Sequence, residues 1–187
     1  MTRVLVTYSS THGQTEKIAR RMARAIEDRG LECELRPVGD DPDPSEFDAV
    51  LAGASIHAGH HQREMAGWVK RHARDLSARP GGFFSVSLTA AEETEEDRRP
   101  AKQLLDEFLE DTGWDPQLRA AVAGALRYRE YNRFTRMVMR RMMRSGGHPT
   151  DSSRDYEYTD WRSVEEFARS LAALAAEDSE LASTGRR

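Results

Sequence analysis

The chain has 187 residues, a formal net charge of −4 at neutral pH and one cysteine, Cys33. This length favours one domain with a substantial core. The mild acidity predicts no general affinity for nucleic acid, and a lone cysteine excludes an intramolecular disulfide and a CxxC metal site. The first apolar run starts within three residues of Met1, and no apolar run approaches the roughly 20 residues of a membrane span. We therefore expect a cytoplasmic protein without a signal peptide, which can still lie on a membrane.

Strand-like apolar runs and amphipathic helical patterns alternate along the chain, which favours a parallel sheet covered on both faces. The predicted strands are residues 4–6, 31–35, 48–54, 83–88 and 120–126. Charged residues alternate with apolar ones in the second strand, which indicates an edge position, whereas the third is apolar enough to be central. Helical patterns begin near Gln14, Gln62, Leu104 and Thr159. Residues 89–100 are predicted to form a long acidic loop, and residues 177–187 a flexible tail.

The loop after the first strand is rich in hydroxyl groups and contains no acid. Backbone N–H groups at a helix N-terminus, the helix dipole and hydroxyl donors together suit a phosphate monoester. The lysine of a P-loop and the three glycines of a dinucleotide fingerprint are both missing. The loop therefore suits a phosphate that is bound but not transferred, although a plain capped helix after a strand is the alternative. The candidate residues are Ser9, Ser10, Thr11, His12, Gly13, Gln14 and Thr15.

This loop resembles the T/S-x-T-G-x-T phosphate loop of flavodoxin-like proteins, which hold flavin mononucleotide (FMN), with His12 in place of the second threonine. A doubly wound fold binds ligands beyond the carboxyl ends of its strands. The flavin ring is therefore expected between the loops after the third and fourth strands. The first of these contains Gly59, whose backbone can adopt a positive φ without steric cost. Neither loop contains Trp or Tyr, which indicates an open ring face. The candidate residues are Ser55, Ile56, His57, Ala58 and Gly59 on one side, and Ser87, Leu88, Thr89 and Ala90 on the other.

Three histidines, His57, His60 and His61, lie in or beside the first of these ring loops. They have no clear carboxylate or cysteine partner in the sequence, so we predict no metal site. One or two of them are expected near the flavin ring or the substrate. A solvated loop position is the alternative for His61.

A basic, methionine-rich stretch, residues 127–144, lies within a long insert at 127–156. At about 100° per residue, its arginines fall on one side of a helix and its aromatic and apolar residues on the other. A helix with this pattern can lie in an anionic membrane interface. The alternatives are packing on its own domain, a dimer surface, nucleic-acid binding, or arginine pairing with substrate carboxylates. The predicted membrane contacts are Arg133, Arg136, Met139, Arg140 and Met143.

The motifs around this insert carry a more specific resemblance. Residues 53–60, 123–128, 145–151 and 158–161, together with the basic insert, are similar to the flavodoxin-type, menaquinone-dependent protoporphyrinogen IX dehydrogenases. The likeness runs from about residue 3 to 175. It departs from the family at Ala58, where an aromatic residue is common, and in the more acidic loop 89–100.

This resemblance implies a five-stranded flavodoxin-like domain, residues 1–176, that binds FMN. It implies oxidation of protoporphyrinogen IX to protoporphyrin IX in haem biosynthesis, with electrons passed to menaquinone or another quinone at the inner face of the cell membrane. The flavin would carry the chemistry, so no catalytic side chain is predicted. Arg127 and Arg129 are the candidates for binding the substrate propionates. A soluble flavodoxin electron carrier and an NAD(P)H:quinone reductase are the alternatives.

Overall fold

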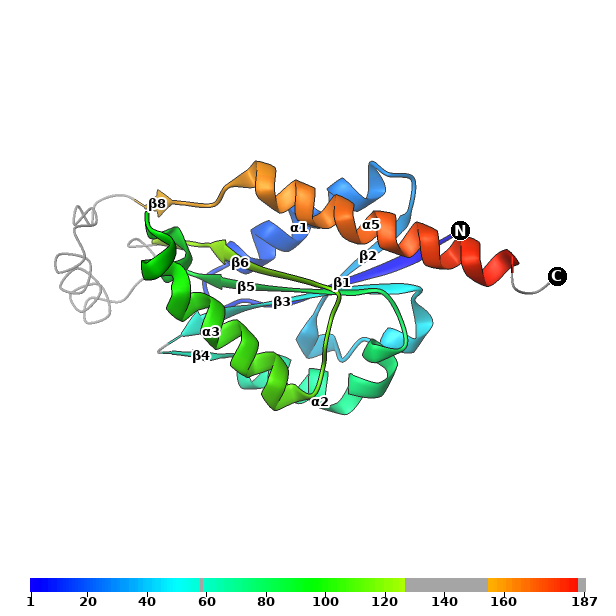
Figure 1. The fold of residues 1–187 in the computed structure, drawn as a ribbon, viewed down its shortest axis with the longest axis horizontal. Helices are drawn as coiled ribbons and strands as arrows, with labels where there is room; N and C mark the ends of the chain where they lie inside the picture. Colours follow the sequence, from blue (N-terminus) through cyan, green and yellow to red (C-terminus); the bar gives the residue numbers. More distant parts are fainter. Residues whose placement is uncertain (58, 127–154, 185–187) are drawn as a thin grey trace.

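A central β-sheet lies between two pairs of helices in the computed structural model, which describes residues 1–57, 59–126 and 155–184 (Figure 1). Helices α1 (Gln14–Glu27) and α5 (Trp161–Thr184) cover one face of the sheet. Helices α2 (Arg63–Ser77) and α3 (Glu95–Thr112) cover the other. The predicted doubly wound α/β architecture is confirmed.

The sheet contains five parallel strands in the order β2-β1-β3-β5-β6. As predicted, β2 is at an edge and β3 is central. A short strand, β4, pairs antiparallel with the end of β3, and β7 pairs with β8 in a separate small sheet. The bounds are β1 Arg3–Ser9, β2 Glu32–Pro37, β3 Ala49–His57, β4 His60–His61, β5 Gly81–Ser87, β6 Leu118–Ala123, β7 Ala125–Leu126 and β8 Tyr156–Glu157.

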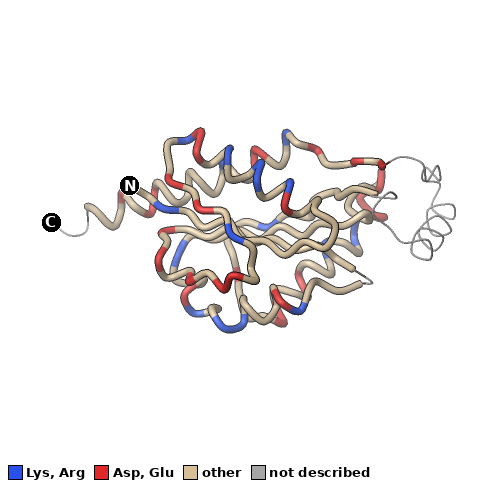
Figure 2. Tube along the Cα trace, turned by 180° about the vertical axis from the view of Figure 1, so that it is seen from behind, with Lys and Arg blue, Asp and Glu red and all other residues tan. Residues whose placement is uncertain are grey.

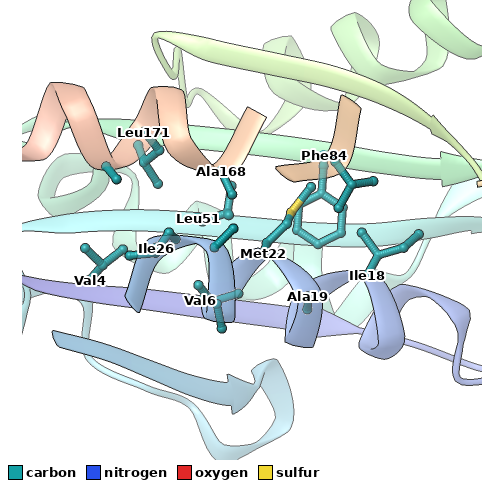
Figure 3. Close-up of a cluster of buried hydrophobic side chains, with 14 of the residues drawn as sticks. Val4, Val6, Ile18, Ala19, Met22, Ile26, Leu51, Phe84, Ala168 and Leu171 are labelled. Carbon is teal, nitrogen blue, oxygen red and sulfur yellow. The ribbon is translucent and has the colours of Figure 1, made fainter. Parts of the chain in front are cut away.

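One hydrophobic core lies between the sheet and helices α1 and α5 (Figure 3). Ile18 and Met22 of α1 are fully buried against strand residues that include Phe84. Gly53 in the neighbouring strand makes room for the Phe84 ring, because a Cβ atom at Gly53 would lie only 2.0 Å from Phe84 Cζ. Cys33 packs at the margin of this core, and burial raises the pKa of its thiol to about 12. Cys33 therefore acts as a small packing residue rather than a reactive thiol.

The second core lies under helices α2 and α3. Phe83 and Phe108 stack with ring centroids 4.7 Å apart, and Trp114 meets the Phe83 ring edge-on. Trp68 is fully buried and its indole N–H donates to the carbonyl of Pro42 at 2.9 Å. Aromatic rings thus fix how α3 lies on the sheet.

Along the chain trace, charged residues occur mainly on the helices and connections, and the edge strand β2 also carries some (Figure 2). Short 3₁₀ turns connect several elements: η1 (Val38–Asp40), η2 (Pro44–Glu46) and η3 (Thr89–Ala91). No helix within the described residues combines the length and apolar character that crossing a membrane requires.

Several boundaries differ from the sequence predictions. The single strand predicted at 120–126 is instead divided at Gly124 into β6 of the main sheet and β7 of the small sheet. The long loop predicted at 89–100 was wrong in its second half, because α3 begins at Glu95. Thr94 caps this helix by accepting a hydrogen bond from the Asp97 N–H at 3.1 Å, and the acids of the first turn favour the positive end of the helix dipole. Residues 177–184, predicted as a tail, continue α5 to Thr184. The predicted basic helix at 127–144 lies outside the described residues.

Candidate functional site

The ends of β1, β3 and β5 meet at one edge of the sheet. Ser9 at the end of β1 is in register with Ala54 of β3, and Ala54 is in register with Ser85 of β5. The loops that follow these strands therefore emerge side by side. These are the three loops that the sequence analysis singled out, so the fold brings the predicted phosphate loop and the two ring loops together.

The loop between β1 and α1 leaves the helix N-terminus open. Gly13 precedes the helix with φ 76°, and its carbonyl accepts the Lys17 N–H at 3.0 Å. No side chain among the described residues caps this end of α1. The first N–H groups of a helix have no intrahelical partner, and the dipole of α1 adds positive potential there, so this end of α1 suits an anion.

Ser10 supplies a direct test of whether this loop fits a phosphate group. Its hydroxyl oxygen is buried and has no hydrogen-bond partner within the described part of the chain. An unsatisfied buried hydroxyl costs about 1–3 kcal/mol. A ligand oxygen at the mouth of α1 would remove that cost, so the residues present fit the phosphate of a flavin nucleotide.

Gln14 and Ser9 hold the loop in place through their side chains. The Gln14 amide donates to Thr159 Oγ1 at 2.8 Å, and both residues are buried. Ser9 Oγ donates to Glu64 Oε2 at 3.4 Å. Thr15 is almost fully buried. The Gln14 side chain therefore ties the start of α1 to Thr159.

A side-chain network joins the phosphate loop to the β3–β4 hairpin. The Gln62 amide donates to Ser55 Oγ and, at 3.4 Å, to Thr11 Oγ1. Ser55 Oγ lies 3.2 Å from His57 Nε2. The Ser55 hydroxyl thus accepts from Gln62 and shares a second hydrogen bond with the His57 ring. The His57 ring then meets the His12 ring edge-on with centroids 5.6 Å apart.

Two histidines of the hairpin, His57 and His61, have lowered pKa values and so favour their neutral forms. Burial, with a smaller effect of nearby His12, lowers the pKa of His57 below its usual value of 6.5. Burial lowers the pKa of His61 to about 4. His61 packs on the Phe108 ring with centroids 4.6 Å apart, and its Nε2 lies 2.7 Å from Ser85 Oγ. The alternative of a solvated loop position for His61 was therefore wrong.

The third loop forms the opposite wall. Ser87 Oγ accepts a hydrogen bond from the Ala90 N–H at 3.2 Å, and the Ser87 carbonyl accepts from the Gly124 N–H at 3.0 Å. Leu88, Thr89 and Ala90 remain partly exposed. This tight turn is held at both ends and offers backbone groups to a ligand beside it.

The other predicted site residues have separate outcomes. Gly59 adopts φ 81°, as its expected turn requires, whereas Ala58 lies outside the described residues. Within the described ranges, no group of three or more His, Cys, Asp or Glu side chains is placed to hold a metal ion. The predicted substrate and membrane contacts also lie outside the described residues: Arg127, Arg129, Arg133, Arg136, Met139, Arg140 and Met143.

Sequence reasoning missed three residues that shape the site: Gln62, Glu64 and Thr159. Thr159 was interpreted only as a helix cap, yet its hydroxyl donates to the Ala123 carbonyl at 2.7 Å while accepting from Gln14. Asp160 instead accepts from the N–H groups of the first turn of α5. Only the polar character of Gln62 so close to the histidines could have indicated a role in the site.

Solved structures with a similar fold include flavodoxins. A short-chain flavodoxin associated with a bacterial microcompartment has a TM-score of 0.61 at 14% identity, covering 94% of this chain and 99% of that one. An oxidised flavodoxin from Bacillus cereus has a TM-score of 0.57 at 17% identity, covering 92% of this chain and 98% of that one. At this identity the likeness shows the fold alone.

Proteins that match by sequence are more similar to this chain than these solved structures are. A family model described as a flavodoxin domain matches residues 5–153. Protoporphyrinogen IX dehydrogenase (quinone) of Escherichia coli K12 is 34% identical, covering 92% of this chain and 96% of its own length. The Leishmania major protein of the same name is 37% identical, covering 91% of this chain and 74% of its own length. The chain therefore belongs to the flavodoxin-domain family, in the group that contains these protoporphyrinogen IX dehydrogenases.

Proposed function

We propose that the protein is an FMN-dependent enzyme that oxidises protoporphyrinogen IX to protoporphyrin IX and passes the electrons to a quinone. The observation that carries this proposal is a relative of that name that is similar over 92% of this chain and 96% of its own length. The unpartnered Ser10 hydroxyl at the open end of α1 supports the cofactor. The flavodoxin fold implies a flavin, and this loop suits the single terminal phosphate of FMN.

The residues of the three loops then have separate tasks. Ser10, Thr11 and the backbone N–H groups of residues 13–15 would bind the phosphate. Residues 55–59 and 87–90 would frame the ring, and the Gln62–Ser55–His57 network would hold the hairpin in position. The remaining predicted contact, His12, would lie beside the ring through its contact with His57. FMN, when bound, supplies the acceptor for the hydride that the substrate loses.

The acceptor and the location follow from the same proposal. The relatives' name specifies a quinone, and menaquinone is the acceptor that we propose. Because menaquinone is lipid-soluble, the enzyme must meet a membrane, and the alternation of arginines and methionines in residues 127–144 supports contact with anionic lipid. From the sequence alone, Arg127 and Arg129 at the start of that stretch are the candidates for pairing with the substrate propionates. We therefore propose a peripheral position on the inner face of the cell membrane.

Anaerobic flavin reduction tests the function. The FMN-loaded protein is mixed separately with protoporphyrinogen IX, with NADPH, and with a ferredoxin reductase and its donor, and the flavin absorbance is followed. We expect rapid bleaching by protoporphyrinogen IX alone, and recovery of the absorbance when menaquinone is added. Rapid reduction by NADPH with none by protoporphyrinogen IX would contradict the proposal and favour an NAD(P)H:quinone reductase.

A further inference from the structure

A cleft of about 560 Å³ lies between α2 and α3, beside the proposed flavin loops. The β3–β4 hairpin forms one end, where His57 and Gly59 line the cleft. His57 also contacts His12 of the phosphate loop. One end of the cleft is therefore shared with the proposed flavin site. Its volume falls within the range of about 300–1,000 Å³ that is typical of small-molecule sites.

The floor of the cleft is apolar and aromatic. Phe108 and His61 contact each other in it, and Leu104 and Ala66 line it from the two helices. Phe108 is backed by Phe83, so the floor is rigid. A flat, largely apolar molecule could lie on this surface and gain contact area with little rearrangement of the protein.

The two walls of the cleft carry opposite charges. Arg63 and Lys70 line it from α2, and Glu107 and Asp111 line it from α3. All four residues are exposed, and no side-chain hydrogen bond or ion pair joins any of them to another described residue. The cleft is thus electrostatically polarised: an anionic group is attracted to the α2 wall and repelled by the α3 wall.

We infer that this cleft binds the tetrapyrrole substrate, with the macrocycle on the Phe108 floor and the carboxylates at Arg63 and Lys70. This inference rests on the proposed function and names the place and orientation of its substrate. Protoporphyrinogen IX has a large apolar ring system and two propionates on one edge, which match the floor and the cationic wall. The acidic wall disfavours the reversed orientation. Arg63 begins α2 directly after the hairpin and Lys70 lies about two turns farther along the helix, so the propionate edge of the macrocycle would lie along α2.

Product binding to the FMN-loaded protein tests this placement. Protoporphyrin IX and its dimethyl ester are titrated in the same dilute detergent, and bound porphyrin is followed by fluorescence. The double variant Arg63→Glu, Lys70→Glu removes the cationic wall. Arg74→Glu changes an exposed residue of the same helix that does not line the cleft. Flavin content, measured by absorbance, shows whether each variant is folded and loaded.

We expect the Kd of protoporphyrin IX to rise at least about tenfold in the double variant and to stay unchanged in Arg74→Glu. The wild type should prefer the diacid over the dimethyl ester, and the double variant should lose that preference. The conservative pair Arg63→Lys, Lys70→Arg should bind like the wild type. An unchanged Kd in the double variant, an equal effect of Arg74→Glu, or no binding to the wild type would overturn the inference.

The failure of this inference can be distinguished from failure of the proposed function. If protoporphyrinogen IX reduces the wild-type flavin but the double variant binds porphyrin normally, the function stands and the cleft assignment is wrong. If the double variant loses porphyrin binding although protoporphyrinogen IX never reduces the flavin, the cleft binds tetrapyrrole dicarboxylates and the proposed reaction is wrong.

Discussion

The Gln14 amide donates a hydrogen bond to the hydroxyl of Thr159 at 2.8 Å across 145 residues of sequence. The Thr159 hydroxyl in turn donates to the carbonyl of Ala123 at the end of β6. This chain of bonds joins the first residue of α1 to the segment that enters α5. The loop that faces the proposed phosphate is thereby held from behind by the C-terminal part of the chain.

Replacing Thr159 by Val should destabilise the protein, because the buried Gln14 amide loses this acceptor. We expect the free energy of unfolding to fall by about 1–3 kcal/mol in urea denaturation. Thr184→Val is the matched control, since the Thr184 hydroxyl only donates to the carbonyl of Glu180 at the exposed end of α5. Equal stability losses in the two variants would show that the buried bond has no special role.

Replacing Gly13 by Ala should impair both folding and cofactor binding. Gly13 (φ 76°) and Gly113 (φ 74°) have similar left-handed backbones, and neither would bring an added Cβ within 4 Å of another group. Each Ala substitution should therefore cost about 1–2 kcal/mol of stability. Only Gly13→Ala should also raise the Kd of FMN, by about tenfold or more, because it alone changes the anion-binding end of α1. FMN fluorescence quenching measures this. Identical FMN affinities in the two variants would place the phosphate elsewhere.

Removing the Ser10 hydroxyl should weaken FMN binding without destabilising the protein. The apo form of Ser10→Ala should be at least as stable as the wild type, because the lost hydroxyl has no partner among the described residues. Its Kd for FMN should rise about three- to tenfold. Thr7→Val removes another buried, unpartnered hydroxyl, in strand β1. The Thr7→Val control should leave FMN binding unchanged. If Thr7→Val weakened FMN binding and Ser10→Ala did not, contact between Ser10 and the phosphate would be contradicted.

Acid should destabilise the protein through His61. Burial lowers the pKa of its imidazole from 6.5 to about 4. As the pH falls through 6.5, the unfolded chain takes up a proton that the folded protein accepts only near pH 4. The free energy of unfolding therefore falls by about 3 kcal/mol as the pH drops from 6.5 to 4. Above pH 6.5 the contribution of His61 does not change with pH.

Urea denaturation at pH 7 and at pH 4.5 measures this loss. His61→Gln should lose less stability than the wild type over this interval, whatever its stability at neutral pH. His60→Gln changes an exposed neighbour and should retain the wild-type pH dependence. Parallel curves for wild type and His61→Gln would contradict the assignment.

Membrane contact should depend on the arginines of the insert. Reversing the charge of Arg133, Arg136 and Arg140 to Glu should reduce co-sedimentation with anionic vesicles more than about tenfold. The control carries the same charge change on α3, at Arg98, Arg99 and Lys102, which are exposed or partly exposed and lie beside acids. Undiminished binding of the first variant, or no binding of the wild type, would refute the interfacial helix.

The layered fold could be predicted because it depends on local periodicity. The alternating charges of β2 indicated an edge and the apolar run of β3 a central strand, and both were confirmed. The start of α3 was not predicted, because the acidic residues there were interpreted as part of a loop. Thr94 supplies a cap, and acids in the first turn stabilise the helix. Ala and Leu in residues 177–184 likewise favour helix over a tail.

The site was predictable only in outline. The hydroxyl-rich loop and Gly13 are local signals, because a strand, a left-handed glycine and a helix follow one another in sequence. The direction of the Gln14 side chain was not predictable, since its partner Thr159 comes from the far end of the chain. His61 appeared to be a loop residue because only the antiparallel pairing of β4 with β3 turns it onto Phe108. The cleft depends on how α2 and α3 pack together.

Titration of the purified wild-type protein with FMN tests the central claim most directly, because every step of the proposed reaction depends on FMN bound at the mouth of α1. We expect a yellow protein that takes up one FMN per chain and quenches or shifts the flavin fluorescence on binding. A protein that is colourless as purified and shows no change in FMN absorbance or fluorescence at saturating concentration would contradict the oxidoreductase function.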